Sequence, residues 1–284
     1  MQHHRWRLSV PPDQEEALEA WLQGAGASAT YRDADPPHAF YAYFPPDLRA
    51  PDPGGLAAFP GVVLEAAESF DDEDWLAKSR EGFGPIEVGR GFYIRPLWDG
   101  GPVPEGRTPI VVNPGLAFGT GGHETTRLCM GLLEGLADRG ELRGPVLDIG
   151  AGTGILALAA FLLGARDITA FDNDPDCGPA MAEFIELNAG VLGGQAPFAH
   201  FVGLLDHPRV KGPYALLLAN ILLETIQELL PAMADLTEPG HRLIASGILR
   251  EREDEALVSL ATAGFQPREV AREGAWIAIL AERP

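Results

Sequence analysis

The apolar and polar positions of the N-terminal part of this 284-residue chain follow the short periods of strands and helices. Residues 5–10 alternate between apolar and polar, which is typical of a half-buried strand, and residues 12–22 carry apolar side chains at helical spacing. Further strands are predicted at residues 28–31, 39–44 and 62–67, with a short apolar turn of helix at 55–59. The resulting order, β-α-β-β-α-β, predicts a small α+β domain of the ferredoxin-like type.

A different pattern begins near residue 100, where strands alternate with longer helices. This alternation indicates a parallel sheet that is covered on both faces. Strands are predicted at residues 167–172, 200–203, 214–220 and 242–246, with helices beginning near Thr125, Pro175, Glu224 and Glu251 and a C-terminal hairpin at 266–271 and 276–280. The predicted fold is therefore α/β with a mostly parallel sheet.

The segment between the two patterns is expected to connect them. Residues 71–78 resemble a helix start, because acidic side chains favour the positive end of a helix dipole. A pair of strands is predicted at 86–88 and 92–96, followed by a loop rich in glycine and proline at 99–109. The predicted domains are a ferredoxin-like domain over 1–68, a connector over 69–99 and an α/β domain over 100–284.

A turn with three glycines lies in residues 146–157, between a buried strand and an apolar helix. In the dinucleotide-binding fingerprint the third glycine follows the second by three residues, whereas here Gly154 follows Gly152 by two. The spacing Asp148-x-Gly150-x-Gly152-x-Gly154 resembles the nucleotide loop of class I S-adenosylmethionine (AdoMet) methyltransferases, whose ligand has no pyrophosphate. Glycine suits this loop because a Cβ would block close approach of the backbone to the ligand, and because such turns often need positive φ.

An acidic residue is expected about 20 positions after such a turn, where it bonds the ribose hydroxyls of the ligand. Asp172 stands there, at the end of the predicted strand 167–172. Asn173-Asp174-Pro175 follows as a turn whose proline can open the next helix. The alternative interpretation is an ordinary turn between a strand and a helix, with Asp172 as a helix cap.

Composition excludes some classes of function. The net charge of −20 argues against a nucleic-acid surface, which needs clustered Lys and Arg. It is compatible with a basic protein partner, although acidity also simply keeps a protein soluble.

Cys129 and Cys177 are far apart and lack metal-ligand spacing, so neither a disulfide nor a metal site is expected. The N-terminal residues lack an apolar signal core, and no run reaches the ~18 apolar residues of a membrane span. We therefore expect a cytoplasmic protein.

Two further motifs flank the glycine turn. Residues 113–127 form an unusual glycine-rich string that leads into the predicted helix, so this loop could lie over a ligand bound at the turn, although a plain loop is the alternative. Downstream, the apolar strand 214–220 ends in the amide of Asn220, at the carboxyl edge of the sheet. Ligands bind at that edge in open α/β sheets.

Taken together, these motifs resemble those of the PrmA family, the methyltransferases of bacterial ribosomal protein L11, a large-subunit protein at the base of the stalk. The resemblance extends from residues 72–75 to 246–249, and its most specific parts are the loop 118–126 and Asn220-Ile221-Leu222. It implies a class I AdoMet-dependent methyltransferase with a Rossmann-like sheet, in which the small N-terminal domain binds ribosomal protein L11. AdoMet is the cofactor that it implies.

The resemblance also implies which residues form the site. Thr126, Gly150, Asp172 and Asn220 would bind AdoMet, and residues 118–123 would form a lid or wall. The full set of candidate cofactor-binding residues is Phe118, Gly119, Thr120, His123, Thr126, Asp148, Gly150, Gly152, Gly154, Asp172 and Asn220. The candidate catalytic residues are Asn220 and Thr125.

Methyl transfer from a sulfonium is an in-line displacement, for which the enzyme supplies position, water exclusion and a deprotonated nucleophile. Desolvation lowers the pKa of a lysine amine, so no dedicated base is required. His123 and Glu124 could accept a proton through water or could instead support the loop. Asn220 could orient the amine or contact AdoMet, and a helix cap is the alternative.

The predicted reaction is methylation of lysine side-chain amines, and of the N-terminal amine, in ribosomal protein L11 that is free before ribosome assembly, by a monomeric enzyme. Enzymes that methylate base amines carry Asn-Pro-Pro and a stacking aromatic, whereas Ile221 and Leu222 follow Asn220 here, so direct nucleic-acid recognition is not expected. The alternatives are a paralogue with another protein substrate, a NAD-dependent oxidoreductase, which the glycine spacing opposes, and an inactive scaffold.

Overall fold

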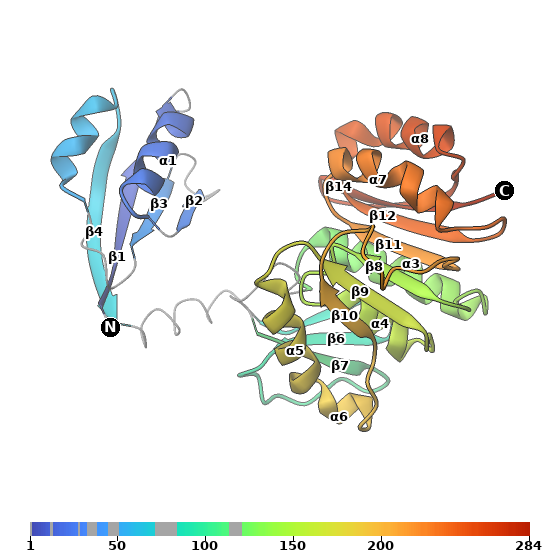
Figure 1. Ribbon diagram of the computed structural model, residues 1–284. Coiled ribbons are helices and arrows are strands. Elements are labelled where there is room, and N and C mark those ends of the chain that lie inside the picture. The colour runs from blue at the N-terminus through green and yellow to red at the C-terminus, as the bar shows by residue number, and fades with distance from the viewer. Residues whose placement is uncertain are drawn as a thin grey trace. The chain divides into compact units, whose positions relative to one another are not determined.

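The structure is a computed structural model, and the residues that it describes are 2–11, 14–27, 29–32, 39–44, 51–71, 84–113 and 121–284. The chain divides into two compact units, residues 1–83 and 84–284 (Figure 1). The described part of the first unit has one hydrophobic core, and that of the second unit has two. Among the described residues, no helix is long and apolar enough to cross a membrane.

The first unit is built on an antiparallel sheet of four strands in the order β2-β3-β1-β4. Its elements are β1 (Gln2–Ser9), α1 (Glu15–Gly24), β2 (Ala29–Arg32), β3 (Ala39–Phe44), η2 (Pro53–Ala58) and β4 (Val63–Asp71). The alternating side chains Trp6 and Leu8 of β1 pack against Leu18 and Leu22 of α1 in the core. The element order and the sheet agree with the ferredoxin-like prediction.

The second helix of this unit is a 3-10 helix, η2. Asp52 caps it by accepting a hydrogen bond from the Gly54 backbone N at 2.9 Å, and Pro53 occupies the first turn, where its missing N–H is not needed. A Cβ on Gly55 would lie 2.4 Å from the Trp21 ring of α1. Glycine therefore allows η2 to pack closely against α1.

The second unit contains a seven-stranded sheet in the order β10-β9-β8-β11-β12-β14-β13. Its strands are β8 (Val146–Ile149), β9 (Ile168–Asp172), β10 (Ala199–Val202), β11 (Leu216–Asn220), β12 (Arg242–Leu249), β13 (Gln266–Glu273) and β14 (Trp276–Glu282). The strands β8 to β12 run parallel, and β14 lies antiparallel between β12 and β13. This is the mostly parallel sheet with a C-terminal hairpin that the sequence predicts.

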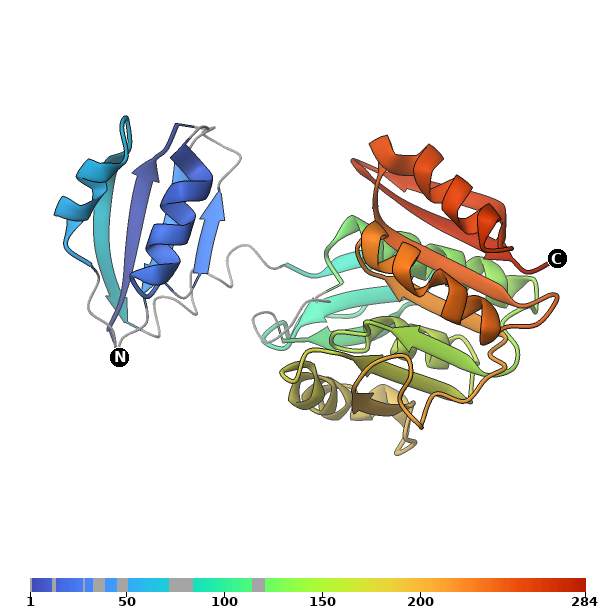
Figure 2. The same ribbon diagram turned by 45° about the horizontal axis from the view of Figure 1, so that its top comes forward.

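Helices cover both faces of this sheet. They are α3 (Glu124–Asp138), α4 (Ile155–Leu162), α5 (Cys177–Leu187), α6 (Ala189–Leu192), α7 (Leu223–Asp235) and α8 (Glu253–Thr262), with the short η3 (Arg250–Arg252) before α8. One core joins the sheet to α3, α4 and α5, and the other joins it to α7 and α8, which Figure 2 shows in orange and red against the sheet. The near-continuous apolar runs of β8 and β11 are buried on both faces, as expected for central parallel strands.

The structure corrects the predicted domain boundaries. Residues 84–99, assigned to the connector, belong to the second unit as β5 (Ile86–Val88) and β6 (Phe92–Pro96), and β4 extends beyond residue 68. Burial explains the first difference, because Phe92 and Ile94 of β6 point into the large core beside α3. The helix start predicted over residues 71–78 lies almost entirely outside the described residues.

The predicted loop at 99–109 runs into a strand that sequence reasoning missed, β7 (Thr108–Val112). This strand pairs in parallel with β6 to complete a three-stranded sheet. Pro109 obscures the pattern, since proline is confined to edge strands, and β7 is such an edge. Asn188 holds β7 from outside the sheet, because its side chain accepts from the Val111 N and donates to the Val111 O, both at 2.8 Å.

Candidate active site

A cavity of about 770 Å³ lies at the carboxyl ends of β8, β9 and β11. Most of the candidate residues line it, although they come from four separate segments of the sequence. These are His123, Thr125, Thr126, Asp148, Gly150, Gly152, Asp172 and Asn220. Phe118, Gly119 and Thr120 lie outside the described residues. The topology therefore brings the described candidates together, with the exception of Gly154.

The glycine turn needs glycine for two different reasons. Gly150, Gly152 and Gly154 have φ of +67°, +56° and +86°, a region that side chains with a Cβ rarely adopt. Close packing adds to this at Gly154, where a Cβ would lie 2.7 Å from the Phe198 ring. Gly154 is absent from the cavity lining and stands at the N-cap of α4. Its part in the site is thus to set the turn, while Gly150 and Gly152 form the cavity wall.

Asp172 ends β9 beside this turn. Its carboxylate accepts hydrogen bonds from the Gly152 backbone N at 2.8 Å and from the Asp174 backbone N at 3.0 Å. The residue is 9% exposed and lines the cavity. The N-cap of α5 is Asp176, which makes no side-chain cap. The alternative that Asp172 caps this helix is therefore wrong, and its carboxylate instead joins the glycine turn to the end of β9.

Asp148, in β8, is hydrogen-bonded to the helix that follows the same turn. It is 1% exposed and accepts a hydrogen bond from the Ala157 backbone N, in the first turn of α4, at 3.0 Å. Burial raises the pKa of Asp148 to about 7; the Ala157 N–H opposes this shift and the charge of Asp172 adds to it. A positively charged ligand in the cavity would favour the ionised form of this carboxyl.

The N-terminus of α3 forms another wall. His123 is the N-cap residue, whose Nδ1 lies 3.3 Å from the Thr125 backbone N that donates to it and 2.9 Å from Thr125 Oγ1. This geometry supports the structural alternative for His123, a capping group that also lines the cavity. Thr125 and Thr126 are each 1% exposed. The helix begins at Glu124, one residue before the predicted start.

Asn220 is the last residue of β11, and its backbone pairs with Ser246 of β12. The following helix, α7, has Leu222 as its N-cap, with no side-chain cap. The alternative that Asn220 caps this helix is therefore wrong. Within the described part of the chain, the Asn220 side chain makes no hydrogen bond, and it lines the cavity. Its amide is thus positioned for a ligand or a substrate.

Several lining residues were missed by sequence reasoning. They are Ala151, Ile155, Leu156, Asn173, Asp174, Asp176, Cys177, Ile221, Leu222, Thr225, Gly247 and Trp276. Those adjacent to recognised motifs could have been inferred from their neighbours. Gly247 belongs to the segment 246–249, which already carried part of the resemblance. Trp276 could not have been inferred in this way, because it lies on β14, which reaches the cavity only through the pairing of the C-terminal strands.

A second cavity of about 680 Å³ shares Gly150, Asn173, Ile221 and Thr225 with the first. Apolar side chains form much of its wall, among them those of Phe171, Leu204 and Leu229. The first cavity is lined by several carboxylates, whereas the second has a largely apolar wall that also contains Asp206, Glu228 and Asp235. Such a combination suits a ligand with polar and charged groups at one end and a flat apolar ring at the other.

The residues present fit AdoMet. Four carboxylates, those of Asp148, Asp172, Asp174 and Asp176, line the main cavity and suit the ribose hydroxyls and the positive groups of this ligand. The bare backbone at Gly150 and Gly152 allows close approach of its amino-acid end. Together with the sheet order, these features define a class I AdoMet-dependent methyltransferase. The chain belongs to the ribosomal protein L11 methyltransferase family, because the family model "Ribosomal protein L11 methyltransferase (PrmA)" matches residues 60–284.

Individual relatives agree with this assignment. The chain is 39% identical over 224 residues to a ribosomal protein L11 methyltransferase of Trichlorobacter lovleyi, covering 75% of this chain and 68% of the relative. It is 35% identical over 261 residues to that of Geobacter metallireducens, covering 87% and 83%. A crystal structure of the ribosomal protein L11 methylase of Lactobacillus delbrueckii subsp. bulgaricus is similar with a TM-score of 0.62 and 33% identity, over 71% of this chain and 99% of that one.

Proposed function

We propose that this protein transfers methyl groups from AdoMet to lysine side-chain amines of ribosomal protein L11, and also to its N-terminal amine. Membership of the family carries AdoMet-dependent methylation of ribosomal protein L11. That the methyl acceptor is an amine goes beyond family membership. A single observation supports it: the amide of Asn220 lies in the wall of the cavity and is followed by Ile221 and Leu222 rather than by a stacking aromatic.

Residues of the described chain would hold AdoMet in the two neighbouring cavities, which share four lining residues. Asp172 would accept hydrogen bonds from the ribose hydroxyls, and Gly150 and Gly152 would pass beside the amino-acid end. The apolar hollow at Phe171 and Leu204 suits the adenine ring. When bound, AdoMet supplies an electrophilic methyl group on a positively charged sulfur. Thr126 completes the wall on the α3 side.

The acceptor amine must reach the cavity without its proton. Apolar contact with Ile155, Leu156 and Leu222 in the cavity wall would reduce the hydration of the amine and disfavour its charged form, so that its pKa falls and the proton leaves to water. The side-chain oxygen of Asn220 would then accept a hydrogen bond from the remaining N–H and aim the lone pair. Thr125 lies in the same wall, where its hydroxyl is shared with His123.

Mass spectrometry of ribosomal protein L11 after incubation with the enzyme and AdoMet tests the acceptor. The expected result is added methyl groups on lysines and on the N-terminal amine. Asn220→Ala should reduce turnover about 10²-fold or more at saturating substrates, with little change in melting temperature, since Asn220 is no helix cap. Methyl groups on other residue types, or full turnover of the Ala variant, would contradict the proposal.

The first unit is proposed to bind the protein substrate, because the described residues that line the cofactor cavities all belong to the second unit. We further propose a monomer that acts in the cytoplasm on ribosomal protein L11 before it joins the ribosome. Removal of residues 1–83 should leave AdoMet affinity nearly unchanged and abolish methylation of the protein. Calorimetry with AdoMet and methylation assays on free protein and on ribosomes measure these outcomes. Full activity of the shortened chain would assign recognition to the second unit.

A further inference from the structure

The wall of the main cavity includes an indole ring that has no role in the proposed reaction. Trp276 is the first residue of β14 and lines the cavity together with Asn220. Because β14 runs antiparallel to β12, its first residue lies at the edge of the sheet where the parallel strands end. Its backbone pairs with Leu249 of β12 on one side and with Glu273 of β13 on the other.

Three contacts, two from the N-terminal part of α3 and one from the residue that follows β12, hold this part of the hairpin. The Trp276 ring meets the ring of His123, the N-cap residue of α3, with centroids 5.0 Å apart and planes at 67°. Arg127 of α3 donates to the Glu273 carboxylate from Nε at 3.0 Å and from Nη2 at 2.5 Å. The Arg250 backbone N donates to the Ala275 carbonyl at 2.7 Å. Trp276 is therefore a fixed part of the cavity wall.

A β-bulge in β12 lies between Asn220 and this ring. The pairing of β12 with β14 shifts between Ser246 and Ile248, which leaves Gly247 as the extra residue, with φ of +82°. A Cβ on Gly247 would lie 2.2 Å from the Ile221 carbonyl O. Bulges commonly redirect side chains next to active sites. Here the bulge lies on β12, between the strands that carry Asn220 and Trp276, and both of these residues line one cavity.

We propose that Trp276 binds the alkylammonium form of the acceptor by a cation–π interaction, and that it thereby determines how many methyl groups one amine receives. This inference rests on the proposed function. In each transfer the nitrogen loses a proton to water and forms a bond to the methyl carbon. The bond between that carbon and sulfur breaks, and its electron pair stays on sulfur. The positive charge passes from sulfur to the methylated nitrogen in the same step, so this nitrogen must lose another proton before the next transfer.

Asn220 and Trp276 respond differently to successive methylation of the acceptor nitrogen. Asn220 can accept a hydrogen bond only from an N–H, and each added methyl group removes one such donor. An indole ring attracts a positive charge whether hydrogens or methyl groups surround the nitrogen, and tryptophan is the strongest aromatic partner of this kind. Trp276 is thus the group that can still bind the acceptor after one or two transfers.

Product analysis of two variants tests this role. Trp276→Leu should raise the KM for ribosomal protein L11 about tenfold and shift its products toward the monomethylated form, whereas Trp276→Phe, which keeps a ring, should do so less. Melting temperatures of both variants and their AdoMet affinities are the controls. Equal product distributions in the wild type and Trp276→Leu would overturn the proposal, as would equal losses of activity and stability in both variants.

A binding measurement separates this inference from the choice of substrate. Choline is a quaternary ammonium probe, and 3,3-dimethyl-1-butanol is its neutral counterpart of the same shape. Choline should change the tryptophan fluorescence of the wild type saturably, the neutral alcohol should do so much less, and Trp276→Leu should lose the difference. Equal responses to both probes in the wild type would contradict a cation–π site. If choline binds as expected while ribosomal protein L11 receives no methyl group, the proposed function fails and the cation site remains.

Discussion

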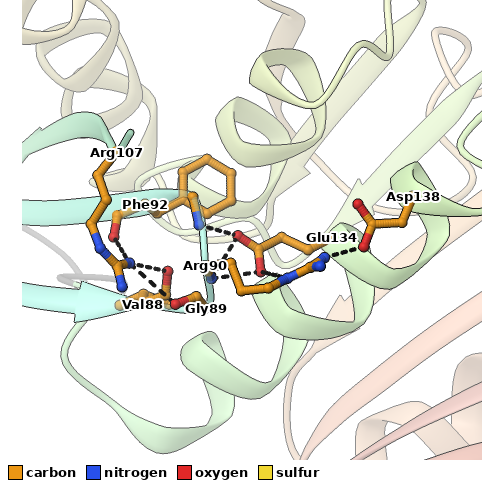
Figure 3. A network of polar contacts seen from close by, with 8 residues as sticks. Val88, Gly89, Arg90, Phe92, Arg107, Glu134 and Asp138 are labelled. Carbon is orange, nitrogen blue, oxygen red and sulfur yellow. Dashed lines mark hydrogen bonds and ion pairs between the residues drawn. The ribbon is translucent and has the colours of Figure 1, made fainter. Parts of the chain in front are cut away.

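Two buried carboxylates in the second unit accept similar backbone hydrogen bonds but have different roles. Glu134 of α3 accepts hydrogen bonds from the Arg90 backbone N at 2.9 and 3.1 Å and from the Gly91 backbone N at 2.7 Å (Figure 3). Asp172 of β9 likewise accepts from two backbone N–H groups, those of Gly152 and Asp174. Each acid therefore fastens a tight turn to a neighbouring element.

The difference lies in what else each carboxylate faces. Glu134 is enclosed by the turn between β5 and β6, where a Cβ on Gly89 would lie 2.3 Å from its Oε2. Figure 3 shows its carboxylate between this turn and α3, with Arg90 reaching on to Asp138. Asp172 borders a cavity of about 770 Å³, so part of its carboxylate can accept bonds from a ligand. Backbone hydrogen bonds alone thus do not separate a structural acid from a binding acid, and the adjacent cavity does.

The largest expected effect is on stability, at Glu134. Glu134→Ala would leave the Arg90 and Gly91 backbone N–H groups without their acceptor in a partly buried place, at a cost of about 2–4 kcal/mol in the free energy of unfolding. Denaturant unfolding measures this cost, and AdoMet affinity should hardly change. Asp138→Ala, on the exposed side of the same network, is the matched control and should show no measurable loss. A large loss of AdoMet affinity in Glu134→Ala would break the comparison.

The next effect is on binding, at Asp172. Asp172→Ala should weaken AdoMet binding by about 1.5–3 kcal/mol, because two ribose hydroxyls lose a charged acceptor. The fold should survive, since the remaining backbone contacts of the turn are kept. Calorimetry with AdoMet measures the affinity, and Asp172→Asn, which keeps an acceptor oxygen without the charge, should lie between wild type and Ala. An unchanged affinity would place Asp172 beside Glu134 as a purely structural acid.

The smallest effect concerns pH and a third buried acid, Asp148. Burial raises the pKa of Asp148 in the folded state to about 7, whereas the unfolded chain ionises this group near ~4. Between these values the folded state keeps a proton that the unfolded state loses, so the contribution of Asp148 to stability falls as pH rises.

Asp148→Asn removes this titration and keeps an oxygen for the Ala157 N–H. The free energy of unfolding of the wild type relative to this variant should therefore fall by about 1–2 kcal/mol between about pH 5.5 and about pH 7. Denaturant unfolding at several pH values measures the difference. A difference that stays constant with pH would show that Asp148 is ionised throughout, like a carboxylate with charged partners.

Much of the second unit could be predicted from the sequence because its signals are local. An apolar run, a glycine turn and a following acid identify β8, α4 and Asp172, since each signal depends only on neighbouring residues and on backbone geometry. The same holds for the ferredoxin-like order of the first unit. Asn220 was recognised as the end of a strand, which is enough to place it at the carboxyl edge of a parallel sheet.

Tertiary structure alone decided the rest. Glu134 looks like any polar helix residue, and only the packing of the turn between β5 and β6 buries it. Trp276 lies more than 50 residues after Asn220 in the sequence, and strand pairing brings the two to one cavity. Whether His123, Asp172 and Asn220 cap helices or face a ligand depended on where α3, α5 and α7 begin. Such properties arise from contacts between distant segments, which local periodicity and spacing do not encode.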